Sequence, residues 1–226
     1  MNYIVATTKS WNIENFKLLK MNDKVNHWFL ITNKENLTLE KIRKIKPRYI
    51  FFPHWSWFIP KEIYKNFECI VFHMTDLPYG RGGSPLQNLI VRDLKQTKIS
   101  AIRVGSGLDT GPIYFKRKLN LSGSAEVIFN RASKIIFANM VTMTKRHFSA
   151  KPQKGKVTTF IRRRPEESDI SNLQSLEQIY NYIRMLDAEG YPNAFLEKGN
   201  IRLEFKNAKL NNGHLSALVG CFLIKK

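Results

Sequence analysis

The sequence predicts an α/β fold: a Rossmann-like, doubly wound and mostly parallel sheet, followed by a small C-terminal unit of α+β or β-hairpin type. In the first half of the chain, short runs of β-branched and aromatic residues alternate with amphipathic stretches. This βαβα alternation is typical of a parallel sheet covered by helices. Residues 151–156 contain proline, glycine and charge but no apolar anchor, which is typical of a linker. We therefore expect a first domain at 1–154 and a second at 155–226.

The first domain begins with four strands, expected at 3–7, 27–32, 48–52 and 69–72. Apolar residues at helical spacing predict helices at 37–45 and 60–67, and a more polar stretch of similar spacing separates the first two strands. Thr38 is the expected N-cap of one helix, and Pro60 stands in the first turn of the other.

The remaining elements follow from the same patterns. Helices are expected at 84–94, 124–148 and 172–186, and strands at 99–104, 112–119, 201–205 and 215–224. The helix at 124–148 is the longest periodic stretch in the chain.

Composition limits where the protein acts. No apolar stretch approaches the roughly 18 residues that a membrane-spanning helix needs, and the N-terminus lacks the basic region of a signal peptide. We therefore expect a cytoplasmic protein that does not insert into membranes. Cys69 and Cys221 are isolated, and the five histidines are scattered, so we expect no metal site.

The formal net charge of +19 has two interpretations. It could attract a polyanion such as nucleic acid, or it could reflect lysines spread over solvated faces. Only residues 43–48 and 162–164 form short basic clusters, and neither a long basic tail nor an RNA-binding aromatic motif accompanies them. The second interpretation is favoured, and nucleic acid is not the expected partner.

Two segments carry candidate chemistry. His73 ends a buried strand, and the loop after it contains Gly80, Gly82 and Gly83, which allow a ligand to approach the backbone. Ligands of open α/β sheets bind outside the carboxyl ends of the strands. Asp109 lies in a glycine-rich turn between two predicted strands. Histidine can move protons near neutral pH, and a carboxylate can orient it.

Together these segments resemble the formyltransferase family. The family pattern runs approximately H-x-S-L-L-P-x-x-R-G, then a helix, a strand and D-x-G. Here it is His73-Met-Thr-Asp-Leu-Pro78-Tyr-Gly-Arg81-Gly82, followed by Asp109-Thr-Gly111. The resemblance covers most of residues 48–120 strongly and 155–210 weakly. It implies an N-formyltransferase that uses 10-formyltetrahydrofolate as formyl donor, with His73 and Asp109 as catalytic residues.

The sugar N-formyltransferases fit best, because residues 75–90 (TDLPYGRGGSPLQNLI) and 108–116 (LDTGPIYFK) look like that group and the chain is short. A methionyl-tRNA formyltransferase would normally carry a complete C-terminal barrel, for which the residues after 186 leave little room. The expected acceptor is therefore the amino group of a nucleotide-linked 4-amino-4,6-dideoxy sugar. A methionyl-tRNA formyltransferase, a formyltetrahydrofolate hydrolase and a non-catalytic folate- or sugar-binding module remain open alternatives. A homodimer is a further open expectation.

The resemblance also implies binding residues. Those expected to bind the folate are Trp57, Phe58, Ile59, Gly82, Leu108 and Asp109. Those expected to bind the acceptor are Lys9, His54, Thr75 and Arg81. Lys9 and His54 follow the first and third strands, where a diphosphate could lie at the carboxyl edge of the sheet. Lys9 could instead be an ordinary surface lysine, and His54 could be packed between aromatic residues.

One position departs from the family pattern. The family places a catalytic asparagine two residues before the histidine, and this chain has Val71 there. Such an amide would stabilise the developing oxyanion by about 3 kcal/mol, by analogy with other oxyanion donors. Either another donor replaces it, or the chemistry is slower or different. Asn88, on the helix that opens at Ser84, is the nearest amide in sequence and the candidate replacement, with a solvated position on the helix surface as the alternative.

Overall fold

The computed structural model describes residues 1–224, and the chain divides into two compact units. The first unit comprises Met1–Gly82, Lys98–Leu119 and Phe129–Thr159, and the second comprises Gly83–Thr97, Asn120–Ile128 and the segment from Phe160 onward. The sequence predicted one boundary, between residues 154 and 155. The observed division differs because residues 83–97 and 120–128 cluster with the C-terminal residues, which no local pattern reveals.

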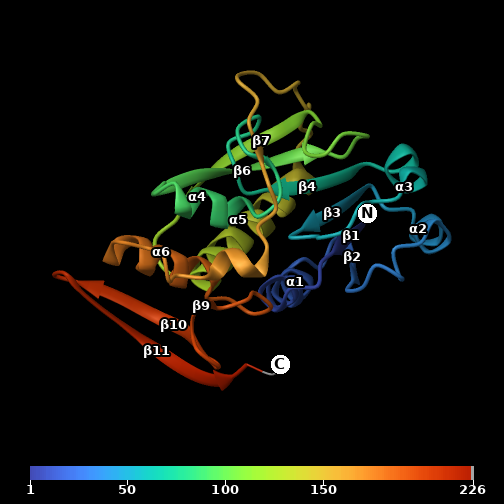
Figure 1. Cartoon of the computed structure of the whole chain (residues 1–226). Coiled ribbons are helices and arrows are strands. Elements are labelled where there is room, and N and C mark those ends of the chain that lie inside the picture. The colour runs from blue at the N-terminus through green and yellow to red at the C-terminus, as the bar shows by residue number, and fades with distance from the viewer. Residues whose placement is uncertain (225–226) are drawn as a thin grey trace. The chain divides into compact units, whose positions relative to one another are not determined.

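A six-stranded sheet with the order β2-β1-β3-β4-β6-β7 forms the body of the first unit (Figure 1). β1 to β4 pair in parallel, and β6 runs antiparallel to β4. This confirms the predicted Rossmann-like, mostly parallel sheet. The strands are β1 (Asn2–Ala6), β2 (His27–Ile31), β3 (Tyr49–Pro53), β4 (Cys69–His73), β6 (Gln96–Arg103) and β7 (Ile113–Asn120).

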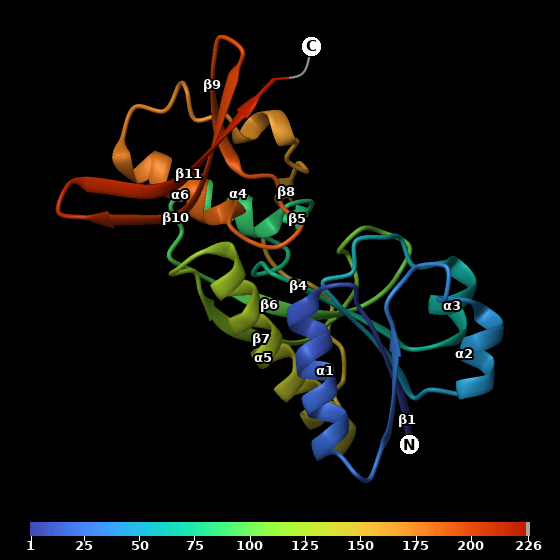
Figure 2. The ribbon, with the colours of Figure 1, turned by 90° about the horizontal axis from the view of Figure 1, so that it is seen from below.

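Helices cover both faces of this sheet because successive strand residues point to opposite sides. On one face, Ile4, Ile50 and Cys69 form an apolar cluster with residues of α2 (Leu39–Ile45) and α3 (Lys61–Asn66). On the other face, Tyr3 stacks on Trp28 and lies near Phe51. There α1 (Ser10–Asn22) lies beside α5 (Ala125–Lys145), as Figures 1 and 2 show.

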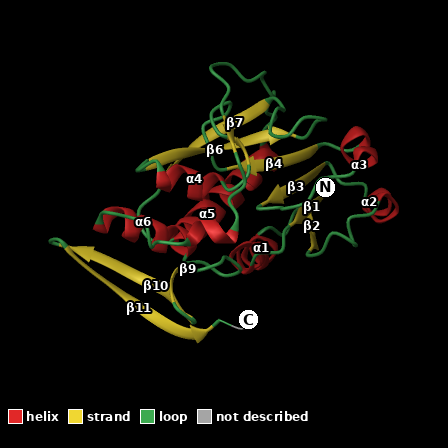
Figure 3. Ribbon diagram, viewed as in Figure 1, coloured by secondary structure: helices red, strands yellow, loops and turns green. Residues whose placement is uncertain are grey.

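The second unit contains an antiparallel three-stranded sheet with the order β11-β10-β9, drawn as yellow arrows in Figure 3. Its elements are α4 (Pro85–Val91), a 3-10 helix (Pro165–Ser168), α6 (Leu176–Leu186), β9 (Ala194–Lys198), β10 (Ile201–Asn211) and β11 (His214–Leu223). α6 packs against α4 and β10. The predicted small unit of α+β type is therefore confirmed, although β9 was not predicted.

Residues 151–156 are not the free linker that their composition suggested. The backbone of Lys151 pairs with Ile113 of β7 through two hydrogen bonds of 2.7 and 2.9 Å. The segment has no apolar side chains to anchor it, as its composition indicated, but backbone hydrogen bonds attach it to β7. Among residues 1–224, no helix is long and apolar enough to cross a membrane.

Candidate active site

His73 and Asp109 lie together in the first unit. His73 is the last residue of β4, and its Nδ1 lies 3.4 Å from Oδ2 of Asp109. Its other ring nitrogen, Nε2, lies 2.8 Å from the carbonyl oxygen of Gly80. A carbonyl can only accept a hydrogen bond, so Nε2 carries a proton and donates it to Gly80. We assign the neutral ring to this tautomer, which leaves Nδ1 as its basic nitrogen, facing the carboxylate.

The loop after β4 holds Asp109 from a second side. The backbone N–H of Gly82, in the two-residue strand β5 (Arg81–Gly82), donates to Asp109 Oδ2 at 2.9 Å. Gly82 has a φ of +107°, a conformation that a residue with a side chain rarely adopts. The same carboxylate oxygen therefore faces both the His73 ring and a backbone donor, and this fixes its position.

The turn that carries Asp109 is tightly constrained. Asp109 has a φ of +53°, in the left-handed region. A Cβ added at Gly111 would lie 1.7 Å from the carbonyl oxygen of Arg103, so only glycine fits there. Leu108, expected to bind the folate, is 59% exposed in this turn and presents an apolar surface beside the carboxylate.

Thr75 and Arg81 were expected to bind the acceptor, but both side chains form hydrogen bonds within the protein. Thr75 is fully buried, and its hydroxyl donates to the Gly80 carbonyl at 3.3 Å. The Arg81 guanidinium donates to Oε1 of Gln153 at 2.7 and 3.2 Å. Both side chains therefore support the site's geometry in this structure.

Asp76 anchors the same loop to the sheet. Its carboxylate pairs with Lys98 at 2.8 Å and also contacts Lys116. Burial opposes ionisation of Asp76, but the hydrogen bonds from Lys116 and Lys98 outweigh it and lower the pKa of this carboxyl. Lys116 also donates to the Leu77 carbonyl at 2.5 Å, which ties the loop to β7.

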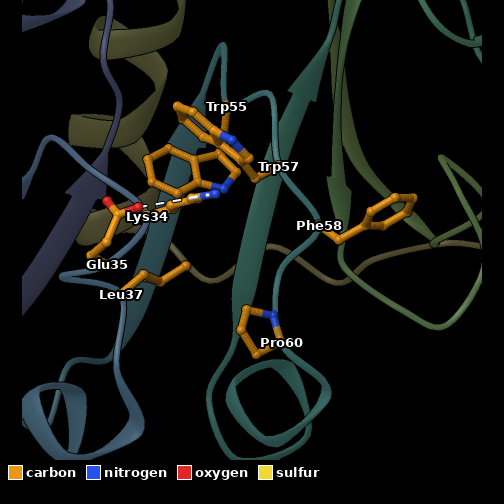
Figure 4. A pocket seen from close by; sticks show the side chains of 7 residues that line it. All are labelled: Lys34, Glu35, Leu37, Trp55, Trp57, Phe58 and Pro60. Carbon is orange, nitrogen blue, oxygen red and sulfur yellow. Dashed lines mark ion pairs between the residues drawn. The ribbon is translucent and has the colours of Figure 1, made fainter.

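Trp57 and Phe58 line a pocket of about 430 Å³ between the β2–α2 and β3–α3 loops (Figure 4). Trp55 contributes a further aromatic wall, 4.9 Å from Trp57 between ring centroids, and its buried Nε1 has no hydrogen-bond partner among residues 1–224. Lys34 lies at the pocket, 4.0 Å from Glu35. Ile59, the third folate residue expected here, packs against the apolar cluster of the sheet instead.

Lys9 and His54 form a separate group with Trp11. The His54 ring lies 4.6 Å from Phe129 and 5.4 Å from Trp11, and Lys9 lies 5.6 Å from the Trp11 ring. Burial, and then the charge of Lys9, lower the pKa of His54 from 6.5 to about 3. A neutral, aromatic-packed histidine suits a structural role better than the binding of a diphosphate.

Asn88 is engaged within the second unit. Its amide nitrogen donates to the carbonyls of Gly83, Ser84 and Ile161 at 3.0–3.2 Å. Its amide oxygen accepts from Arg92 at 3.0 Å. An amide has two N–H groups, and here carbonyl partners already occupy both. This arrangement argues against Asn88 as the replacement oxyanion donor.

Val71, at the position of the family asparagine, packs on the apolar cluster beside Trp55 and Ile59. It shares a face of β4 with His73, because residues two apart on a strand point the same way. The aliphatic side chain therefore extends the apolar wall of the sheet up to His73.

Three contributors were not predicted from the sequence: the Gly80 carbonyl, Trp55 and Gln153. The Gln153 amide nitrogen donates to the carbonyls of Asp109 and Gly111 at 2.7 and 2.9 Å. It stands in the segment that composition assigned to a linker, where no local signal distinguishes it. Among the described residues, no group of three or more His, Cys, Asp or Glu side chains could hold a metal ion.

Comparison with known proteins decides the family. A solved structure described as methionyl-tRNA formyltransferase from Clostridium thermocellum is 58% identical, covers 99% of each chain and has a TM-score of 0.95. The chain belongs to the formyltransferase family. Residues 165–221 match the family model described as methionyl-tRNA formyltransferase, C-terminal domain. The formyl donor of formyltransferases is 10-formyltetrahydrofolate, as the resemblance implied.

More distant formyltransferases agree. The methionyl-tRNA formyltransferase of Campylobacter jejuni is 28% identical over 178 residues, which cover 76% of this chain. The chain spans 57% of the length of that relative. A 4-N formyltransferase from Francisella tularensis is 12% identical with a TM-score of 0.67, over 100% of this chain and 98% of that one. That likeness shows the fold alone.

The assignment to the sugar-directed branch, with a nucleotide-linked amino sugar as acceptor, is therefore wrong. It depended on two motifs that look like the sugar-directed group and on the expectation that a methionyl-tRNA formyltransferase carries a complete C-terminal barrel. The Clostridium thermocellum chain carries a methionyl-tRNA formyltransferase name at the same length, so length does not exclude that branch. α6 and a three-stranded sheet occupy most of the region that matches the C-terminal domain model.

The low pKa of His54 predicts a pH dependence of stability. The unfolded histidine binds a proton near pH 6.5, whereas the folded one does so only near pH 3. Between these values the unfolded state binds more protons, so this group destabilises the fold as pH falls. We expect the unfolding free energy, measured by urea denaturation, to decrease as the pH is lowered from 7 to 4.5. This decrease should be smaller for His54→Phe than for the wild type, because the variant has no titrating group at this position. An exposed control, His147→Phe, should follow the wild type.

The Val71 position predicts a gain of activity. Val71→Asn should lower the unfolding free energy by about 1–3 kcal/mol, because a polar group enters an apolar wall. The new amide would lie on the same strand face as His73, where an oxyanion donor belongs, so we expect kcat for formyl transfer to rise. Val104→Asn is the matched control, since Val104 packs on the same cluster. Equal kcat changes in the two variants would contradict the oxyanion argument.

Proposed function

We propose that this chain transfers the formyl group of 10-formyltetrahydrofolate to the α-amino group of methionyl-tRNA. The observation that carries the proposal is the end-to-end likeness to the Clostridium thermocellum structure, which includes the C-terminal unit as well as the catalytic one. The match of residues 165–221 to the C-terminal domain model supports the same acceptor.

The geometry of His73 supports acyl transfer. As the amine attacks the formyl carbon it loses a proton, and the His73–Asp109 pair takes it. The new Nδ1–H can then donate to Asp109 Oδ2, which stabilises the charged ring. A C–N bond to the amine forms, the C–N bond to the folate breaks, and the departing folate nitrogen takes a proton.

The aromatic pocket supports folate as the donor. Its volume of about 430 Å³ and its walls of Trp55, Trp57 and Phe58 suit a flat heteroaromatic ring. The buried Trp55 Nε1 can donate to such a ring, and Lys34 can pair with a carboxylate tail.

The distribution of charge supports a polyanionic acceptor. Residues 129–159 contain no aspartate or glutamate, and their basic residues are Arg131, Lys134, Lys145, Arg146, Lys151, Lys154 and Lys156. In contrast, residues 160–226 contain ten basic and eight acidic residues. The excess positive charge therefore belongs to the catalytic unit, where the aminoacylated end of a tRNA would have to enter.

The direct test is an acceptor assay. The chain, incubated with 10-formyltetrahydrofolate and methionyl-tRNA, should yield formylmethionyl-tRNA detectable by acid gel electrophoresis. Transfer to a nucleotide-linked amino sugar with no product on tRNA would overturn the proposal. Formate release in the absence of any acceptor would indicate a hydrolase.

His73→Asn and Asp109→Asn should each lower kcat for this reaction at least about 100-fold, because general-base catalysis contributes roughly 10²–10⁴-fold. Binding of the folate, measured by tryptophan fluorescence, should change little, since neither residue lines the aromatic pocket. His147→Asn, at an exposed position, is the control. Near-wild-type turnover in either site variant would remove that residue from the mechanism.

The basic segment next to the site gives a second prediction. Lys151, Lys154 and Lys156 are exposed, and no ion pair within residues 1–224 involves them. Their combined replacement by alanine should weaken tRNA binding about tenfold or more at 0.1 M salt. It should also reduce the slope of log K against log salt by about 2, as expected for the loss of three phosphate contacts. Binding is measured by fluorescence anisotropy over a series of KCl concentrations.

The control replaces three exposed lysines of the same unit, Lys17, Lys20 and Lys24, by alanine. Both variants lose the same net charge, so only a local contact separates them. An equal salt slope in the two variants would contradict the prediction, because it would show that tRNA responds to the net charge and not to a contact with Lys151, Lys154 and Lys156.

A further inference from the structure

The turn that carries Asp109 has to reach back along β4. Arg103, the last residue of β6, pairs with Ile70, three residues before His73. At about 3.3 Å per residue this is a distance of roughly 10 Å along the strand. The turn must cover that distance before the Asp109 carboxylate can meet the His73 ring.

Little within the turn itself sets this position. Its internal backbone hydrogen bond, from Thr110 N–H to the Gly107 carbonyl, is 3.4 Å long, and the Thr110 hydroxyl adds one of 3.0 Å. Asp109 also occupies the left-handed region, which is disfavoured for a residue with a side chain. An external constraint is therefore needed.

Gln153 supplies that constraint and uses its whole amide to do so. Its two N–H groups match the carbonyls of Asp109 and Gly111, and its oxygen accepts twice from Arg81. If the amide oxygen and nitrogen of Gln153 were exchanged, its oxygen would face two carbonyl oxygens, which cannot donate a hydrogen bond. The four partners therefore determine which atom is the oxygen and which the nitrogen.

Gln153 is itself held on both sides. Two residues earlier, Lys151 pairs with Ile113 of β7. Further on, the Thr158 hydroxyl accepts from Gly80 N–H at 2.7 Å, and the Thr158 carbonyl accepts from Arg81 N–H at 3.0 Å. The segment 151–158 therefore links the Asp109 turn to the loop whose Gly80 carbonyl and Gly82 amide contact His73 and Asp109.

We infer that Gln153 is a positioning residue of the formyl-transfer site, and that it acts through Asp109 by fixing the backbone of the turn. The inference rests on the proposed function, in which Asp109 supports His73. Gln153 touches neither reacting group, so its effect belongs in kcat and not in the binding of either substrate.

Gln153→Met keeps the length of the side chain and removes all four hydrogen bonds. Gln153→Glu keeps the acceptors for Arg81 but turns a carboxylate toward the two carbonyls. We expect both variants to lower kcat about 10–100-fold, with the KM for the donor changed less than about twofold. In the uncharged Gln153→Met variant the KM for tRNA should also change less than about twofold. Gln174→Met, at an exposed position, is the control and should match the wild type.

A double-mutant cycle separates positioning from general destabilisation. Once Asp109→Asn has removed the carboxylate, Gln153→Met should cause no further loss of kcat, because the two changes act on one interaction. Fully additive losses, or a Gln153→Met variant with wild-type kcat, would overturn the inference.

One readout does not require turnover. The Gly82 amide donates to Asp109 Oδ2, so its ¹H–¹⁵N signal should shift in Gln153→Met and stay unchanged in Gln174→Met. An unmoved Gly82 signal would overturn the inference even if the enzyme is active. If the wild type does not formylate methionyl-tRNA, the proposed function fails, and the Gly82 signal still decides whether Gln153 holds the turn.

Discussion

Backbone groups of one loop set the geometry of the contact between the His73 ring and the Asp109 carboxylate. The Gly80 carbonyl fixes which ring nitrogen carries the proton, and the Gly82 amide fixes the carboxylate oxygen that faces the other nitrogen. Both groups belong to one loop, so a shift of that loop would disturb the histidine and the aspartate together. The relative position of His73 and Asp109 therefore depends on the loop after β4.

That loop is held from beneath by polar contacts to the neighbouring strands. The Ser100 hydroxyl of β6 donates to the Thr75 carbonyl at 2.7 Å and accepts from the Leu77 amide at 3.3 Å. Lys98 and Lys116 bind Asp76 from β6 and β7. Buried polar groups must find partners, and in this loop the partners come from strands that the sheet already fixes. The sheet thus determines where the catalytic histidine points.

The sequence was sufficient to predict the sheet, most helices and the two side chains, His73 and Asp109, that the fold brings together. Hydrophobic periodicity is a local signal, and the strands of the first unit carry it clearly. His73 and Asp109 stand in glycine-rich segments whose order and spacing match a family pattern. Gln153 could not be predicted, because its role depends on carbonyls that only the folded turn brings within reach. The division into units was missed for a similar reason, since residues 83–97 join the C-terminal segment through contacts distant in sequence.

The acceptor was mispredicted for a different reason. The short C-terminal unit was taken as evidence against a tRNA substrate, because a methionyl-tRNA formyltransferase was expected to carry a complete C-terminal barrel. The charge distribution suggests another arrangement: the segment free of acidic residues lies in the catalytic unit and includes Gln153, which contacts the Asp109 turn. A polyanion attracted to this segment would reach the site through the surface of the catalytic unit itself. A small C-terminal unit and a tRNA acceptor are then compatible, because the electrostatic attraction is built into the unit that performs the chemistry.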